Sequence, residues 1–301
     1  MSTTSERTVT EPEKFVFDQR VDALSVRIVN GAVNVVGTED GTARVEVTEL
    51  AGPPLKVQLK GGSLVVTYED LPWKGLLKWW DRKGMHRHAV VSLAVPQGTR
   101  VEVGVVGANA VVSGISGATS IQGVNGDTAL VGLSGPVRAN TVSGNVEAQS
   151  VSGDLDVNTV SGDLTVVEGS GSHVLANSVS GSMVLDLDPS AGAQVRLATV
   201  SGEIAIRIPE PGDAEVHANT TSGAISCAFD ELHVTGTWGS KVVTGRIGAG
   251  RSRLRATTLS GAIALLRRPA IDDFTDPADP RDTADTTDTS DGGPTSPRKD
   301  I

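Results

Sequence analysis

Residues 140–166, NTVSGNVEAQSVSGDLDVNTVSGDLTV, decide the fold of this chain, because they hold a Ser-Gly pair three times at intervals of nine residues. The same interval separates seven consecutive Ser-Gly or Asn-Gly pairs between residues 116 and 171, and looser copies follow as far as residue 261. Aliphatic side chains stand two and four positions after most of these glycines, with polar or small residues between them. This alternation is typical of a strand that buries one face.

Each Ser-Gly pair marks a predicted corner between two strands. Glycine tolerates backbone angles that other residues resist, and the serine hydroxyl can bond the amides of the turn itself. A helical alternative is excluded, because the pairs would interrupt a helix every nine residues. The corner residues that we assign are Ser143, Gly144, Ser152, Gly153, Ser161, Gly162, Ser180, Gly181, Ser201, Gly202, Ser222 and Gly223.

An asparagine three residues before the serine reveals a longer period. Its copies lie 18, 19 and 42 residues apart, and Ala198 stands at the equivalent place inside the longest interval. One coil therefore takes about 18–21 residues. In stacked coils these amides would lie one strand spacing apart, about 4.8 Å, and could bond along the stack. The predicted asparagine ladder comprises Asn140, Asn158, Asn177 and Asn219.

These patterns predict an all-β fold, a single-stranded parallel β-solenoid that is similar to a β-helix and has about 18–21 residues per coil. Each coil hides its apolar face only by stacking on its neighbours. We expect a disordered N-terminus over residues 1–13, an irregular N-terminal β region over 14–106, the solenoid over 107–267, and a disordered acidic tail over 268–301.

The N-terminal β region carries two turn signals of its own. Asn30-Gly31 separates two alternating segments, and Gly61-Gly62 stands between two apolar runs as in a hairpin. The region forms either the first coils with a hairpin cap or a small β-domain that docks on the solenoid. A cover of this kind is expected, because the open sheet edges at the end of a solenoid are adhesive.

Residues 72–88 differ from the rest of the chain, since they hold three of its four tryptophans and a run of basic residues. Apolar residues at i, i+3, i+4 and i+7 predict one face of a short helix. Either this insert packs its tryptophans on the solenoid, or it rests on an anionic membrane surface. A metal site at His86 and His88 is disfavoured, because no acidic cluster stands nearby. The residues of a membrane or partner contact would be Trp73, Lys74, Lys78, Trp79, Trp80 and Arg82.

Composition and charge restrict the classes of function. The chain has 301 residues, 35 glycines, 3% aromatic residues and a net charge of −10, much of it in the tail, so the mildly acidic body predicts no nucleic-acid partner. The polar first ten residues and the lack of a long apolar run predict neither a secretory signal nor a membrane-spanning helix, and we expect a cytoplasmic location. Cys227, the only cysteine, excludes an intrachain disulfide and is interpreted as a core residue.

A search for catalytic motifs favours no enzyme class. The chain has no phosphate-binding G-x-x-x-x-G-K-[ST], no H-E-x-x-H and no G-x-S-x-G. Asp154, Asp156 and Asp163 could gather on one surface as the acid–base carboxylates of a carbohydrate-active β-helix enzyme. They are also the ordinary polar residues of their corners, which is the interpretation we favour. Calcium is not expected, because the repeat lacks the paired glycines of calcium-binding β-rolls.

The repeats resemble a known bacterial family. Residues 140–148, 157–166 and 199–206, together with the segments 29–35 and 95–98, are similar to the β-strand-repeat family labelled putative adhesin, a domain of unknown function. The resemblance covers roughly residues 14–267. It implies a β-solenoid and assigns no catalytic residue, no metal and no cofactor.

The sequence therefore predicts a non-enzymatic scaffold or binding protein, cytoplasmic or peripheral to a membrane, whose sheet faces meet an unknown protein or surface ligand. Two alternatives stay open. One is a carbohydrate-active β-helix enzyme that uses surface carboxylates, and the other is an exported cell-surface adhesin.

Overall fold

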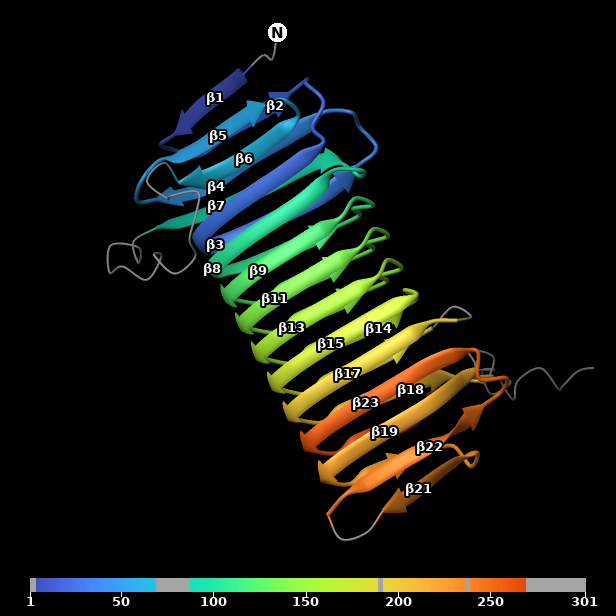
Figure 1. Cartoon of the computed structure of the whole chain (residues 1–301). Helices are drawn as coiled ribbons and strands as arrows, with labels where there is room; N and C mark the ends of the chain where they lie inside the picture. Colours follow the sequence, from blue (N-terminus) through green and yellow to red (C-terminus); the bar gives the residue numbers. More distant parts are fainter. Residues whose placement is uncertain (1–3, 69–86, 189–191, 237–238, 269–301) are drawn as a thin grey trace, which may run out of the picture. The chain divides into compact units, whose positions relative to one another are not determined.

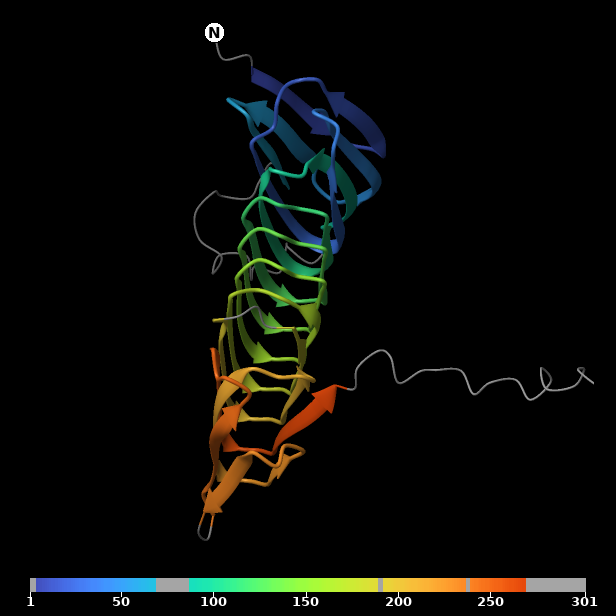
Figure 2. The same ribbon diagram turned by 90° about the vertical axis from the view of Figure 1, so that its right-hand side faces the viewer.

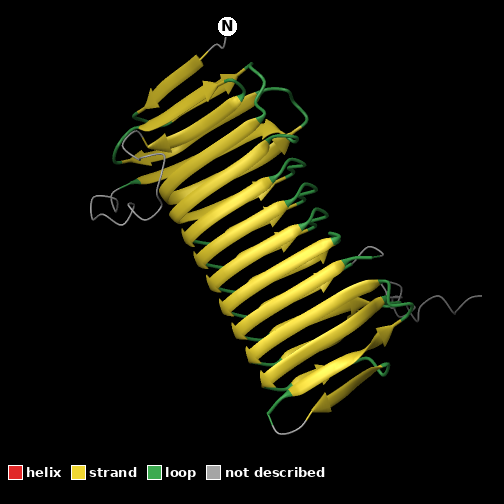
Figure 3. Cartoon of the chain, in the orientation of Figure 1, coloured by secondary structure: helices red, strands yellow, loops and turns green. Residues whose placement is uncertain are grey.

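The computed structural model of the protein describes residues 4–68, 87–188, 192–236 and 239–268. These ranges form 24 β-strands and contain no helix (Figure 3). In the central part, each strand pairs in parallel with a strand 18, 19 or 21 residues further along the chain, which confirms the predicted β-solenoid and its period. The described ranges belong to one compact unit, and the predicted acidic tail, apart from Arg268, lies outside them.

The strands form one continuous sheet that folds into two sides of the solenoid, named here face A and face B, and the long strands β3 (Ala23–Thr38) and β8 (Arg100–Ser113) contribute to both (Figure 1). Figure 2 shows the two faces as separate layers joined at the corners of the coils. Beyond β8, face A continues in space through β9 (Thr119–Asn125), β11 (Val137–Ser143), β13 (Leu155–Ser161), β15 (His173–Ser180) and β17 (Gln194–Ser201). Face B continues through β10 (Thr128–Val131), β12 (Val146–Gln149), β14 (Leu164–Gly169), β16 (Met183–Leu187) and β18 (Ile204–Pro209).

The core lies between the two faces and is built from the inward positions of every strand. Residues on β11 and β13 alternate between buried and exposed, as the two-residue period of the sequence predicts. A short third side closes each coil, where Ile115, Leu133 and Val151 stack with their side chains buried. Backbone bonds join this side from coil to coil, for example from Ser152 N to Leu133 O at 2.9 Å. Burial of aliphatic rows between stacked coils is the main source of stability in such a fold.

The corner glycines fall into two separate rows, so the nine-residue interval describes half a coil. One row, at the corner from face A to face B, follows the spatial order Gly126, Gly144, Gly162, Gly181, Gly202, Gly261 and Gly223. The other row, at the return to face A, holds Gly117, Gly135, Gly153 and Gly171. In both rows, a Cβ atom on a glycine would overlap the backbone carbonyl group in the coil below it. Glycine is therefore required for the close approach of the coils, in addition to the bend that the sequence predicts.

The N-terminal end is more ordered than the sequence predicts. Residues 4–9, within the segment expected to be disordered, form β1 and pair antiparallel with β5. The predicted hairpin at Gly61-Gly62 is confirmed as the β5–β6 pair. The N-terminal strands extend both faces beyond β3: β1 (Thr4–Val9), β5 (Leu55–Lys60) and β6 (Ser63–Tyr68) on face A, and β2 (Glu13–Phe17), β4 (Ala43–Ala51) and β7 (His88–Pro96) on face B.

Asn30-Gly31 does not separate two strands of a turn, because β3 runs through it without a break from face A to face B. Gly31 has a positive φ of 116°, and a Cβ there would overlap the carbonyl of Ala89. The residue pair bends one long strand where the sequence predicts a turn between two. In this way β3 already has the path of a complete coil.

The C-terminal coils are stacked out of sequence order. After β18, the chain forms β19 (Ala214–Ser222), β20 (Ile225–Cys227), β21 (Leu232–Gly236) and β22 (Lys241–Ile247), and then returns as β23 (Ser252–Ser260) and β24 (Ile263–Arg268). β23 pairs in parallel with both β17 and β19, and β24 pairs with both β18 and β20. The last coil is thus inserted between two earlier ones, and the β21–β22 hairpin extends face A beyond β19 (Figure 1).

The aliphatic residues that precede the corner serines also divide into two sets. Val151, on the short third side, is 1% exposed, whereas the equivalent residues on face A are between 45% and 54% exposed. These exposed residues are Val142, Val160, Val179, Val200 and Leu259. The sequence alone does not distinguish the buried set from the exposed set, because every one of these residues stands immediately before a Ser-Gly pair.

The glycine rows lead to a prediction about stability. Gly153→Ala is expected to lower the free energy of unfolding by about 3 kcal/mol or more, because the added Cβ would overlap the carbonyl of Gly135 and force the coils apart. Gly98→Ala is the matched control, because a Cβ at this exposed glycine meets no atom within 4 Å. Denaturant unfolding monitored by circular dichroism checks both variants. Equal stabilities would show that the coils do not need the close approach.

Candidate functional site

The predicted asparagine ladder is present over three coils. Asn140, Asn158 and Asn177 lie in register on β11, β13 and β15. Asn158 Nδ2 donates to Asn140 Oδ1 at 3.2 Å, and Asn177 Nδ2 donates to Asn158 Oδ1 at 2.9 Å. Asn219 lies in the same row but is separated from the other three by Ala198 and Thr257, and its Oδ1 accepts a bond of 2.7 Å from Thr257 Oγ1. The ladder is a structural element of face A.

A second ladder, which the sequence analysis did not identify, runs along the corner between face A and face B. At each step, a side-chain oxygen accepts a bond from the backbone N–H group one coil further on. Asp127 Oδ1 accepts from Asn145 N at 2.9 Å, Asn145 Oδ1 from Asp163 N at 3.0 Å, and Asp163 Oδ1 from Ser182 N at 2.8 Å. Asp163 is therefore used to satisfy the backbone of the next coil.

The three carboxylates proposed for catalysis do not gather at one place. Asp154 precedes β13 and Asp163 follows it, so the two lie at opposite ends of a seven-residue strand, about 20 Å apart along it. Asp156 lies on face A, where Arg138 Nε donates to it at 3.0 Å and Asn158 Nδ2 donates at 2.9 Å. Asp154 and Asp156 border the same groove, but Asp163 does not. The alternative in which all three share one surface does not fit this geometry, because Asp163 stands at the next corner.

Asp154 is held in its ionised form. Its Oδ1 accepts bonds from Ser172 Oγ at 2.8 Å and from His173 N at 3.2 Å. The hydrogen bond from Ser172, assisted by the charge of His173 and its backbone N–H group, holds the pKa of the Asp154 carboxyl below its ordinary value of 3.8. A general acid requires a pKa shift in the opposite direction.

The other candidate residues add no further functional site in the described part of the chain. Trp73, Lys74, Lys78, Trp79, Trp80, Arg82 and His86 lie outside the described residues, so the proposed membrane or partner contact stays a prediction. His88 Nε2 lies 3.0 Å from Glu49 Oε2, and the described ranges hold no group of three or more residues that could bind a metal ion. Cys227 is partly buried, and its Sγ lies 3.6 Å from the carbonyl oxygen of Phe229. In the part of the chain that the structure describes, no helix is long and apolar enough to span a membrane.

Face A carries two adjoining depressions on its outward side. The larger, of about 690 Å³, extends over β8, β9, β11, β13, β15 and β17, and its floor includes Arg138, Asp156 and Leu175. The smaller, of about 360 Å³, extends over β17, β23 and β19. Both are open to solvent and are lined by a mixture of charged, amide and aliphatic side chains.

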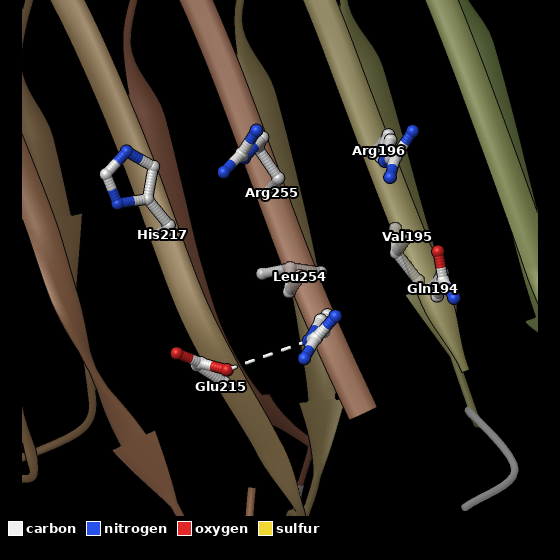
Figure 4. Close-up of a pocket in the computed structure, with 8 residues that line it drawn as sticks. Gln194, Val195, Arg196, Glu215, His217, Leu254 and Arg255 are labelled. Carbon is white, nitrogen blue, oxygen red and sulfur yellow. Dashed lines mark ion pairs between the residues drawn. The ribbon is translucent and has the colours of Figure 1, made fainter. Parts of the chain in front are cut away.

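The smaller depression holds a group of basic residues that the sequence analysis missed. Arg196, Arg255 and His217 lie in one row across β17, β23 and β19 (Figure 4). Arg253 and Glu215 stand two residues before Arg255 and His217 on the same two strands. Aligning the repeats on their corner serines would have placed these three residues at one position, since each stands five residues before a serine. Nothing in the sequence shows that β23 lies between β17 and β19.

The contacts of Asp154 lead to a prediction about pH. Because the pKa is lowered in the folded state, ionised Asp154 stabilises the fold above its unfolded pKa, and this contribution is lost as the pH falls through the folded pKa. Asp154→Asn should therefore lower the melting temperature at pH 7 by about 1–2 °C, a small effect because the side chain is 56% exposed. The difference from wild type should shrink as the pH falls below 3.8, the ordinary pKa of the carboxyl.

Melting curves between pH 3 and pH 7 check this expectation. Glu147→Gln, which removes one charge from an exposed position on β12, is the control for a change in net charge. A stability difference between wild type and Asp154→Asn that persists unchanged at pH 3 would contradict the assigned role of the carboxylate.

Comparison with known proteins places the chain in a family. The family profile described as Toastrack DUF4097 matches residues 21–266. No curated protein matches the chain. Among solved structures, the chain is similar to one described as a putative cell adhesion protein from Clostridium sporogenes ATCC 15579, with 10% identity, 86% of this chain and 100% of that chain covered, and a TM-score of 0.27. It is also similar to one described as a putative lipid binding protein from Parabacteroides distasonis ATCC 8503, with 10% identity, 85% and 97% covered, and a TM-score of 0.23.

The profile match covers most of the chain, including the N-terminal strands, the stacked coils and the inserted last coil. The resemblance stated from the Ser-Gly repeats is confirmed by it. The chain belongs to the Toastrack DUF4097 family, a family of unknown function.

Proposed function

We propose that the chain is a non-enzymatic binding scaffold that holds its ligand on the outward side of face A. The observation that carries this proposal is the groove of about 690 Å³ over six consecutive strands of that face. Its floor is a hydrogen-bonded sheet whose side chains are fixed by the stacking of the coils. A surface of this kind is already formed before a ligand binds, which lowers the cost of binding.

The chemistry of the groove suits recognition. Leu175 on β15 is 39% exposed and offers an apolar contact, while Asp156 on the adjacent β13 and Arg138 on β11 offer an anion and a cation. Binding sites commonly combine apolar area with a few polar groups that fix the orientation of the ligand. The partner of this surface is a ligand that presents both apolar and charged groups.

The positions of the carboxylates support a scaffold over a carbohydrate-active enzyme. Glycoside hydrolysis requires two carboxyl groups within about 5–10 Å of each other, one of them with a raised pKa. Here Asp163 is too far from Asp154, at the other end of β13. Asp156 stands only two residues from Asp154, but the pKa of Asp154 is lowered rather than raised. Asp156 is engaged by Arg138 at 3.0 Å. The cytoplasmic location, contact with a membrane and the exported adhesin of the sequence analysis all stay predictions.

A pair of substitutions on one coil tests the proposal. Leu175→Asp places a charge on β15 within the face A groove, and Val184→Asp places the same charge on the outward side of face B. The two side chains are 39% and 45% exposed, so each variant should fold with little change in stability. We expect Leu175→Asp to reduce capture of the native ligand by about tenfold or more, and Val184→Asp to leave it unchanged.

The measurement is quantitative mass spectrometry of material retained by the wild type and by each variant from the native cell. Loss of the ligand with Val184→Asp but not with Leu175→Asp would move the binding surface to face B and overturn the proposal. Turnover of a glycan by the wild type that Asp154→Asn abolishes would replace the scaffold with the enzyme.

A further inference from the structure

Three basic side chains lie next to one another on the outward side of face A. Arg196 on β17 is directly opposite Arg255 on β23, and Arg255 is directly opposite His217 on β19. All three are exposed. Neighbouring strands in a sheet are about 4.8 Å apart, so two guanidinium groups and an imidazole share a short row. Figure 4 shows this row, with Gln194 and Glu215 beside it.

The charge of this row is not balanced within the described part of the chain. Arg196 and Arg255 form no ion pair with a carboxylate there. Arg253 has one acidic neighbour, Glu215, at the long distance of 3.8 Å between Nε and Oε2, and its side chain is 76% exposed. By contrast Arg138, further along the same row of face A, lies 3.0 Å from Asp156.

Like charges directly opposite each other on neighbouring strands destabilise a sheet. The chain as a whole is acidic, with a net charge of −10, so a local excess of positive charge is not explained by its composition. An anion placed over the row would remove the repulsion between the two guanidinium groups. The free energy of that repulsion would then favour the bound state.

The order of the coils creates the row. Arg255 and Arg253 belong to the last coil, which is inserted between the coils that carry Arg196 and His217. If the coils followed sequence order, β19 would lie between β17 and β23. His217 would then separate Arg196 from Arg255, and the two arginines would not be direct neighbours. The inserted strand also forms the floor of the depression of about 360 Å³, where Val195 and Leu254 lie beneath the polar side chains.

We infer that this arginine row binds a ligand through its phosphate groups. The inference rests on the proposed function, because it assigns a chemical class to one part of the face A surface. Each guanidinium presents a planar fork of N–H donors that matches phosphate oxygens. A carboxylate has only two oxygens in one plane, whereas the terminal oxygens of a phosphate point in several directions and can meet donors on three strands at once. The amide of Gln194 adds another donor at the edge of the depression.

Isothermal titration calorimetry of the full chain with inorganic pyrophosphate tests the inference. The double variant Arg196→Gln/Arg255→Gln removes the two facing guanidinium groups and keeps neutral, hydrogen-bonding side chains at both positions. We expect the wild type to bind pyrophosphate, more weakly as salt is added, and the double variant to bind at least about tenfold more weakly. Arg207→Gln is the control, because it removes an exposed arginine from β18 on face B, outside both depressions, and it should bind like the wild type.

A second arm separates a soluble phosphate ligand from a lipid headgroup. Vesicles of phosphatidylcholine alone and vesicles that also contain phosphatidic acid are sedimented with the wild type and with the double variant. Co-sedimentation that requires both phosphatidic acid and the two arginines assigns the phosphate to a lipid, whereas binding of pyrophosphate without co-sedimentation assigns it to a soluble ligand. Binding of neither probe by the wild type, or equal binding by the wild type and the double variant, overturns the inference.

The double variant also provides a readout that does not depend on the ligand. Removal of two facing like charges should leave its melting temperature equal to that of the wild type or raise it. A fall of several degrees would show that the arginines stabilise the fold, which would contradict the inference. Failure here is distinct from failure of the proposed function, because capture of the native ligand by the double variant can be measured as well. Capture that persists without the two arginines would keep the groove as the binding surface and remove only the phosphate assignment.

Discussion

The contact on which the stack depends is that of a glycine Cα with the backbone carbonyl of the corner below it. In the row from Gly126 to Gly223, this contact is repeated in seven coils, and any side chain would occupy the space of the carbonyl oxygen. The aliphatic core supplies most of the stabilising free energy, but its residues can vary in size from alanine to leucine at one position. The corner glycines cannot be replaced by larger residues in the same way. They fix the distance between coils, and that distance in turn aligns the side chains on the outside.

The alignment explains how the polar residues are used. When equivalent positions lie one strand apart, a single hydrogen-bonding residue in each coil becomes a continuous ladder, as with Asn158 on face A and Asp163 at the corner. Side chains committed in this way are satisfied by their neighbours and have little capacity left for chemistry. Where the repeat varies, the same alignment places side chains together that do not bond one another, and the facing pair of Arg196 and Arg255 is such a place. Variation among the coils, rather than the repeat itself, marks the surfaces that can recognise a ligand.

Much of this fold could be predicted from the sequence, because its period is local. The interval of nine residues, the alternation of buried and exposed positions and the coil of 18–21 residues all follow from residues near one another in the chain. What could not be predicted depends on distant pairing. The strands β17, β19 and β23 end in the same Ser-Gly corner, so their sequences are equally suited to stack on one another and do not specify which of them is in the middle. The arginine row was missed for this reason. That residues 4–9 form the ordered strand β1 was not predicted, because a short polar segment forms a strand only when a sheet edge such as β5 is available to pair with it.

The inserted last coil also restricts the order in which the protein can be assembled. β19 and β18 belong to coils that are separated in space by residues made after both of them. On the ribosome, the growing chain can add coils one upon another as far as β18, but the next layer is supplied only when β23 and β24 have emerged. Until then, the strands β19–β22 lack their partners β23 and β24, and they either stay unpaired on that side or pair temporarily with another strand. Completion of the stack is thus tied to the end of translation of the folded unit, and the final step is a long-range closure with a high entropic cost.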